Sequence, residues 1–281
     1  MRLLISYFHY QDPEVVKELT AAGVKLFVDS GAFGAFKAGT TLDVRAYAEF
    51  LKECGPSIDG CFNMDVIGDA RASKRNLDLI KSYGINPLPV WQGFAVDDFK
   101  GIDAFVDGED YVAIGGLVKT HNTTRSADFN ERRITSFMNA VAGRAKVHLL
   151  GYANPPNIKR FKPYSCDAST VARALRYGLD FELWNISTGK KTLLNKQMKG
   201  YDMAMMDLLL KITRNPNLDV ANPTRRTKIP GELWCPAREI TWASYANLSI
   251  YVERVMGVKM YLVGCLKDDI HFAKELARRG L

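Results

Sequence analysis

The sequence lacks the features that mark membrane, disulfide-linked and zinc-binding proteins. No apolar run approaches the ~18 residues of a transmembrane helix, and Met1–Ser6 is too short for a secretory signal peptide. The five cysteines are an odd number and form no Cys-x-x-Cys pair, so neither a disulfide framework nor a zinc site is expected. We therefore expect a protein of the reducing cytoplasm that contacts no membrane and holds no metal.

Low-complexity tracts are also absent. Hydrophobic residues make up 47% and charged residues 25% of the 281-residue chain, which argues against wholesale disorder. At ~100–200 residues per domain, this length allows one large domain or two small ones. The 38 Lys and Arg exceed the 31 Asp and Glu by 7, and this positive charge favours a polyanionic partner.

Short β-prone segments alternate with helical patterns along most of the chain. Eight strands are predicted, at residues 3–8, 25–28, 60–65, 87–92, 110–114, 146–151, 162–167 and 259–264. Eight strand–helix units predict an α/β fold, a (β/α)8 (TIM) barrel, whose usual length is ~250 residues. An open, doubly wound sheet is the alternative architecture.

Residues 181–257 interrupt this alternation between the seventh and eighth strands. The segment has 11 Lys and Arg against seven Asp and Glu, so it carries +4 of the net charge. Helical patterns cover 201–212 and 243–256, and Pro-containing turns lie between them. We expect a single barrel domain, 1–281, with 181–257 as a basic, partly helical insertion that binds nucleic acid.

Polar residues and glycines lie where several of the predicted strands end. In a barrel these carboxyl ends form one rim, where the chemistry occurs. The residues concerned are His9, Asp29, Ser30, Asp65, Gln92, Gly115, Gly116, Gly151 and Asp167. Each has a local explanation, because Asp caps helices and Gln-Gly or Gly-Gly forms turns. Capping explains much less easily why all of them meet at one rim.

Three carboxylates at one rim suggest either metal binding or catalysis at a sugar carbon. Metal sites usually include His or a tighter carboxylate cluster. At an anomeric carbon, one carboxylate attacks while another moves protons. Gly115 and Gly116 offer backbone N–H groups with no side chain in the way, and Phe33 can stack on a flat ligand.

The segment Asp29-Ser30-Gly31-Ala32-Phe33 resembles the Asp-Ser-Gly-Gly-Tyr/Phe motif of the tRNA-guanine transglycosylase superfamily. Further matches follow in that family's order and approximate spacing, over about 1–180 and the closing strand and helix. They are Asp65, Trp91-Gln92-Gly93, Ile114-Gly115-Gly116-Leu117, Leu149-Leu150-Gly151 and Ser165-Cys166-Asp167.

The resemblance implies a role for each matched residue. Asp167 would be the nucleophile that displaces guanine and holds the sugar covalently. Asp29 would be the general acid/base that deprotonates the incoming 7-deazaguanine. No cofactor is implied. The expected base-binding residues are Ser30 and Asp65 at the N1–H and amine edge, Gln92 and the Gly116 N–H at the 6-oxygen with Gly115 beside them, and Phe33 and Leu150 on the ring faces.

The sequence also departs from the tRNA enzymes. The Cys-x-Cys-x-x-Cys zinc motif is missing, Ala168-Ser169-Thr170 replaces Pro-Thr-Arg, and Val118–His121 lacks the usual acidic residue. These departures look more like the DNA-deazaguanine transglycosylases of bacteriophages and bacterial modification islands, which protect DNA from restriction. The expected partners are DNA and a free 7-deazaguanine base in the cytoplasm (the host's, if phage-encoded), with a homodimer as a further candidate.

Basic residues of the insertion are the expected phosphate contacts: Lys190, Lys191, Arg225, Arg226 and Lys228. Trp184, Trp234 and Trp242 could stack on unpaired bases, although packing of the insertion onto the barrel is the favoured explanation.

Two other functions stay open. One is the same chemistry on tRNA, and the other is hydrolysis of a deazaguanine nucleoside or nucleotide, with water in place of the incoming base. A non-catalytic nucleic-acid binder would have little reason to keep Asp29, Asp65 and Asp167 together.

Overall fold

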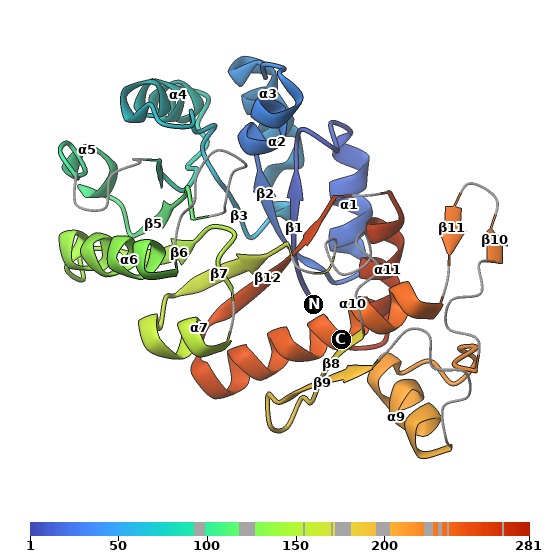
Figure 1. Ribbon diagram of the computed structural model, residues 1–281. Coiled ribbons are helices and arrows are strands. Elements are labelled where there is room, and N and C mark those ends of the chain that lie inside the picture. Colours follow the sequence, from blue (N-terminus) through green and yellow to red (C-terminus); the bar gives the residue numbers. More distant parts are fainter. Residues whose placement is uncertain are drawn as a thin grey trace.

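The computed structural model of the chain (Figure 1) describes residues 1–92, 99–117, 127–153, 155–169, 171, 181–194, 203–221, 227–229, 232–234, 236–265 and 267–281. Within these ranges, no helix combines the length and apolar character that crossing a membrane requires.

Eight parallel strands form one curled sheet, which confirms the α/β fold (Figure 1). Each predicted strand is found, and most are shorter than predicted. Their order in the sheet is β3-β2-β1-β12-β7-β6-β5-β4. The bounds are β1 Arg2–Ser6, β2 Lys25–Asp29, β3 Gly60–Cys61, β4 Val90–Trp91, β5 Tyr111–Ile114, β6 Lys146–Leu149, β7 Ser165–Ala168 and β12 Lys259–Gly264.

Hydrogen bonds also join the residues that follow β3 to those around the start of β4. Phe62, which follows β3, forms a parallel bridge with Leu88, just before β4. The Asn63 N–H donates to the Leu88 carbonyl at 3.0 Å, and the Asn63 side-chain oxygen accepts from Val90 N at 2.7 Å. Backbone and side-chain bonds therefore connect β3 with the segment that leads into β4.

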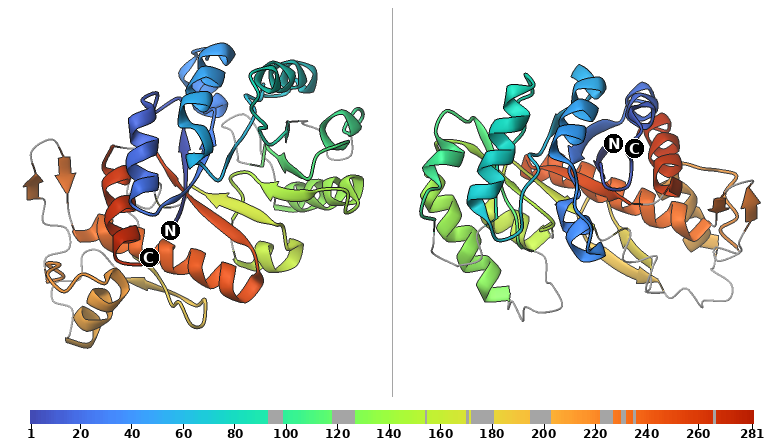
Figure 2. Two further views of the ribbon diagram at one scale, coloured as in Figure 1. Left: turned by 180° about the vertical axis from the view of Figure 1, so that it is seen from behind. Right: turned by 90° about the horizontal axis from the view of Figure 1, so that it is seen from above.

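Helices lie on the outer side of the curled sheet (Figure 2). Three of them begin at an aspartate whose carboxylate accepts a backbone N–H of the first turn: Asp12, Asp43 and Asp69. The helices are α1 Pro13–Ala21, α2 Ala32–Ala38, α3 Val44–Cys54, α4 Ala70–Ser82, α5 Asp103–Val106, α6 Ala127–Val141, α7 Pro155–Phe161 and α11 Lys267–Arg278, with a 3-10 turn at Gly55–Ser57.

Aromatic side chains of opposite strands meet on the inner side of the sheet. The Phe27 ring of β2 lies 6.3 Å from the Tyr111 ring of β5 and 5.0 Å from the Tyr261 ring of β12. Phe62 lies 4.9 Å from the ring of His148 in β6. These contacts fill the interior beneath the carboxyl ends of the strands.

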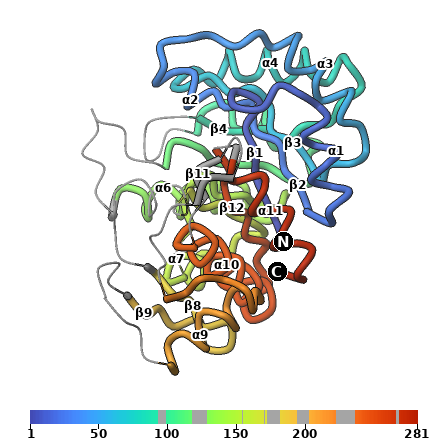
Figure 3. Tube along the Cα trace, turned by 90° about the vertical axis from the view of Figure 1, so that its right-hand side faces the viewer, coloured from blue at the N-terminus to red at the C-terminus, as the bar shows by residue number. Residues whose placement is uncertain are grey.

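The segment between β7 and β12 contains two antiparallel hairpins and two long helices. Figure 3 shows β8, β9 and α9 together on the side away from α2, α3 and α4. The elements are β8 Phe181–Trp184, β9 Lys191–Leu194, α9 Met203–Thr213, β10 Thr227–Ile229, β11 Glu232–Trp234, α10 Pro236–Tyr251 and a π-helical turn Val252–Met256. Both predicted helices are therefore present, the second one within α10 and the π-helical turn.

Helix α10 belongs to the hydrophobic core, and almost every residue along it is buried. Trp242 is fully buried, and its indole N–H donates to the carboxylate of Asp269 at 3.1 Å. Its packing role is therefore confirmed and stacking on bases is excluded for it. Trp184 lies partly exposed in β8 with Lys191 Nζ 5.8 Å from its ring. The side chain of Trp234 lies outside the described residues.

Candidate active site

Three aspartates occupy the carboxyl ends of β2, β3 and β7. Asp29 is the last residue of β2, Asp65 follows β3, and Asp167 is the third residue of β7. Because these strands are parallel, their carboxyl ends lie at one rim of the sheet. Burial, followed by the charges of Asp65 and Asp167, raises the pKa of Asp29. The structure thus places the three predicted carboxylates at the same end of the sheet.

Asp29 does not cap a helix. Its carboxylate accepts the N–H of Gly31 at 3.0 Å, whereas α2 begins at Gly31 without a side-chain cap. Gly31 has φ +80°, and a Cβ there would come within 2.4 Å of the Phe8 side chain, so only glycine fits this turn. The turn holds the Asp29 carboxylate at the rim.

Burial raises the pKa of Asp29 to about 7, with the charge of Asp65 as the second cause and that of Asp167 as a smaller one. The Gly31 N–H, which favours the ionised form, opposes this rise. A carboxyl group with a pKa near neutrality can both take up and release a proton at physiological pH. The local environment of Asp29 therefore suits acid/base work.

Asp65 and Gln92 form a buried pair. Burial raises the pKa of Asp65 to about 6, and the hydrogen bond from the Gln92 amide acts in the opposite direction. The Gln92 side-chain oxygen is buried and has no hydrogen-bond partner among the described residues. Gln92, expected to address the 6-oxygen of a base, thus presents an acceptor in this orientation, which suits an N–H donor of a ligand.

Gly115 has a different role from the expected one. Its N–H donates to the carbonyl of Trp91 at 2.9 Å, so this group is committed to the sheet. A Cβ at Gly115 would lie 2.3 Å from the Gln92 amide nitrogen. The glycine therefore makes room for Gln92 and does not itself supply the predicted backbone donor. Gly116 follows with φ +68°, at the point where the chain leaves the strand.

Asp167 is 4% exposed and is held through one oxygen. Its Oδ1 accepts the N–H of Gly151 at 2.7 Å and lies 3.1 Å from Nε2 of His148. No bond to Oδ2 is found among the described residues. Asp167 thus has one fixed oxygen and one that can react.

His148 is the site residue that the sequence reasoning missed. It is fully buried at the third position of β6, between the apolar Val147 and Leu149. Because side chains alternate across a strand, one polar residue in an apolar strand of a barrel must face either the interior or the helices. That signal was available in the sequence.

The remaining predicted base-binding residues are near this rim. Ser30 is fully buried, and its hydroxyl accepts the N–H of Ala32 at 3.2 Å. Phe33 is partly exposed on α2, with Lys37 Nζ 4.4 Å from its ring. Leu150 is partly buried against the inner aromatic cluster. Their contacts with a base stay predictions.

Several predicted features lie outside the described residues. They are Gly93, Val118–His121, Thr170, Arg225, Arg226 and the side chain of Lys228. Of the predicted phosphate contacts, Lys190 and Lys191 are described and exposed at the β8–β9 turn. Lys191 forms an ion pair with Glu182 at 2.8 Å.

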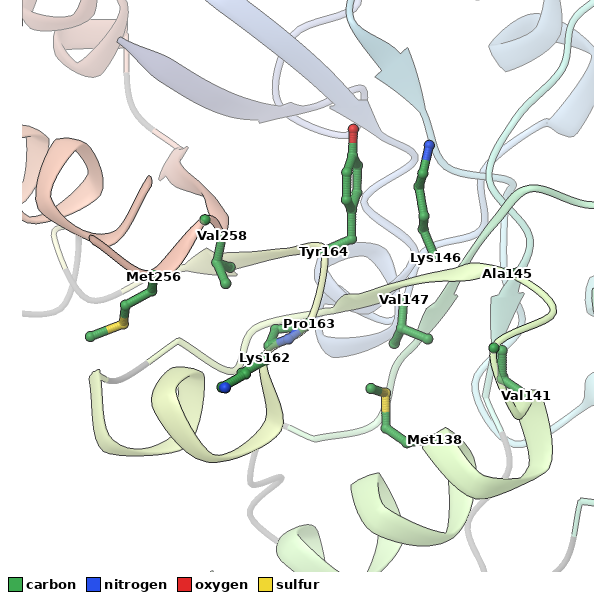
Figure 4. Close-up of a pocket in the computed structure, with 12 residues that line it drawn as sticks. Met138, Val141, Ala145, Lys146, Val147, Lys162, Pro163, Tyr164, Met256 and Val258 are labelled. Atoms are coloured by element: carbon green, nitrogen blue, oxygen red, sulfur yellow. The ribbon is translucent and has the colours of Figure 1, made fainter. Parts of the chain in front are cut away.

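A cavity of about 370 Å³ lies at the opposite end of the strands (Figure 4). Its lining includes Lys146 and Val147 at the start of β6, Tyr164 just before β7 and Val258 just before β12. It is therefore separate from the carboxylates. Within the described ranges, no group of three or more His, Cys, Asp or Glu is placed to hold a metal ion.

Neither the protein-family models nor the curated protein sequences with which the chain was compared match it.

Proposed function

We propose that this chain is a DNA-guanine transglycosylase, which exchanges guanine in DNA for a 7-deazaguanine base through a covalent glycosyl-aspartate. The proposal rests on one observation: three carboxylates at the carboxyl ends of the strands have three different environments. Asp167 has one oxygen held by donors, Asp29 has a pKa of about 7, and Asp65 pairs with Gln92. A nucleophile, an acid/base and a base-recognition group are thus available at one rim.

In the first step, Oδ2 of Asp167 forms a bond to C1′ of the nucleotide while the C1′–N9 bond breaks. The electron pair leaves with guanine, which takes the proton carried by Asp29. In the second step, the incoming base gives its N9 proton to Asp29, and N9 attacks C1′. Asp167 leaves as a carboxylate, and Asp29 is protonated again, so no proton is gained or lost over the cycle.

Asp65 and the free oxygen of Gln92 supply acceptors for the N1–H and amine of a guanine-like edge. Because both side chains are buried, an unpaired partner is costly, and a base without these donors binds less well. The target nucleotide must leave its stack to reach them.

We infer that the sheet closes into a (β/α)8 barrel. The bridge between Phe62, just after β3, and Leu88, just before β4, supports closure. So do the ring contacts of Phe27 with Tyr111 and of Phe62 with His148, which join opposite strands through the interior. A closed barrel would present all of its carboxyl ends around one mouth.

The choice of DNA rests on charge. The net charge of +7 favours a polyanion, and Lys190 and Lys191 are exposed on the insertion. The resemblance to phage and bacterial DNA-modifying enzymes supports the same choice, with protection from restriction as the purpose and the cytoplasm as the compartment. A nucleoside hydrolase would need no such basic surface.

The test is a base-exchange assay with radiolabelled guanine, in which duplex DNA, single-stranded DNA and tRNA are offered in parallel. Asp167→Asn is the inactive variant, and Asp78→Asn, an exposed aspartate of α4, is the matched control. Label in DNA with the wild type and the control, but not with Asp167→Asn, supports the proposal. Label only in tRNA, or release of base from a deazaguanine nucleoside without exchange, overturns the DNA assignment.

A further inference from the structure

A line of hydrogen-bonded side chains runs from Asp167 through the interior of the sheet. Oδ1 of Asp167 lies 3.1 Å from His148 Nε2. His148 Nδ1 is in hydrogen-bond contact with the hydroxyl of Ser165, and that hydroxyl contacts the hydroxyl of Tyr111. The residues come from three neighbouring strands, β5, β6 and β7, and His148 and Ser165 are fully buried.

The chemistry of the four groups orders their protons. An ionised carboxylate only accepts, so Nε2 of His148 must donate to Asp167. In a neutral imidazole the other nitrogen, Nδ1, is then an acceptor, and Ser165 must donate to it. The oxygen of Ser165 can in turn accept the proton of Tyr111. Every donor points toward Asp167, and each group in the line is satisfied without an extra charge.

Two phenylalanine rings pack against the imidazole of His148. Phe27 of β2 and Phe62, which follows β3, lie against the imidazole, with ring centroids 6.3 and 4.9 Å away. Apolar burial penalises an imidazolium.

Three titratable groups of the described part of the chain face His148 or are joined to it. Asp167 on β7 and Tyr261 on β12, whose ring lies 6.4 Å away, face it directly. Tyr111 on β5 is joined to it through Ser165. Behind Tyr261, Arg2 lies 5.7 Å from the phenol ring and forms an ion pair with Glu253.

Tyr111 begins the line at the amino end of β5. Burial raises the pKa of its phenol, so the hydroxyl stays protonated and can donate. Its ring packs edge-on against Tyr164 at 5.1 Å. The Tyr164 hydroxyl accepts a hydrogen bond from Lys259 Nζ at 2.5 Å. Among the described residues, Tyr164 has no hydrogen bond to Tyr111, Ser165 or His148.

We propose that Tyr111 and Ser165 hold His148 as the neutral tautomer with its proton on Nε2, and that His148 thereby fixes Oδ1 of Asp167 and leaves Oδ2 to attack. All three are positioning residues, because they act on the reaction through Asp167. The inference rests on the proposed function only in making Asp167 the nucleophile; the tautomer is a property of the free protein.

The tautomer is measured by long-range nitrogen–proton NMR on protein labelled with 15N in its four histidines. The His148 signals are assigned with His148→Gln. We expect Nε2 protonated and Nδ1 bare at pH 7. Tyr111→Phe and Ser165→Ala should change this pattern, whereas Tyr164→Phe should leave it unchanged. A proton on Nδ1 in the wild type would overturn the proposal.

The second measurement is the pH profile of base exchange. Tyr111→Phe should lower kcat by about tenfold and move the acidic limb of the profile, with little change in KM. His148→Leu, which leaves Asp167 without this donor, should lower kcat by roughly 100-fold, and His148→Gln, which keeps an N–H donor, should recover much of it. Equal kcat for His148→Leu and the wild type, or an unshifted profile for Tyr111→Phe, would refute the positioning role. If the wild type exchanges no base at all, the proposed function fails, and the NMR result still decides the tautomer.

Discussion

The Asp29→Asn variant should become more stable relative to the wild type as the pH rises. The unfolded chain loses the Asp29 proton near the ordinary pKa of 3.8, whereas the folded chain keeps it until about pH 7. Between these values the folded state binds the extra proton, so stability falls as the pH increases. Each pH unit costs about 1.4 kcal/mol, and the interval from pH 5 to pH 7 therefore costs about 3 kcal/mol.

Asparagine carries no proton to lose, and its side-chain oxygen can still accept the Gly31 N–H. The free energy of unfolding of Asp29→Asn, relative to the wild type, should thus rise by about 3 kcal/mol between pH 5 and pH 8. Urea denaturation at the two pH values, followed by tryptophan fluorescence, gives this difference. The exposed Asp78→Asn variant is the control, and its difference from the wild type should stay nearly constant.

A relative stability of Asp29→Asn that is the same at pH 5 and pH 8 would refute the argument, because it would mean that Asp29 titrates like an exposed carboxyl. Base exchange by the same variant should be lost at both pH values, since an amide cannot carry the proton between the two bases.

Two further changes test the recognition surfaces. Gly115→Ala should destabilise the protein by about 1–3 kcal/mol or displace Gln92, because the new methyl group overlaps the Gln92 amide. Urea denaturation measures the loss of stability. The control is Gly264→Ala, which should cost much less because its Cβ would lie 3.5 Å from the nearest neighbour. Replacing Lys190 and Lys191 together with Ala should weaken binding to duplex DNA and reduce the slope of log K against log salt by about 1.8, as expected for two lost phosphate contacts. An unchanged slope in fluorescence anisotropy would return these two lysines to the role of a solvated surface.

Local rules were sufficient to predict much of the fold. Short β-prone runs that end in Asp or Gly predicted strands such as β2, and Asp12 before Pro13 predicted the start of α1. These rules could not separate Asp29 from the helix-capping aspartates. The structure made that distinction, because it shows the Asp29 carboxylate accepting the N–H of Gly31. Local sequence places a carboxylate at a strand end, but the neighbouring strands decide what it contacts.

The features that the sequence did not predict depend on how side chains of different strands pack against one another. The space that Gly115 leaves for Gln92 depends on how β4 and β5 pair. The donor that His148 offers to Asp167 depends on the pairing of β6 with β7. Helix α10 was expected in a nucleic-acid-binding insertion, and its burial became visible only when its position beside β12 was known.

The central claim is that Asp167 forms a covalent bond to a nucleotide sugar. The most direct measurement is the intact mass of the protein after incubation with a guanine-containing duplex oligonucleotide and rapid denaturation, followed by peptide mapping. We predict an adduct with the mass of the protein plus the oligonucleotide that has lost guanine, mapped to Asp167 and absent from Asp167→Asn. An adduct on another residue, or exchange of base by Asp167→Asn, would contradict the account.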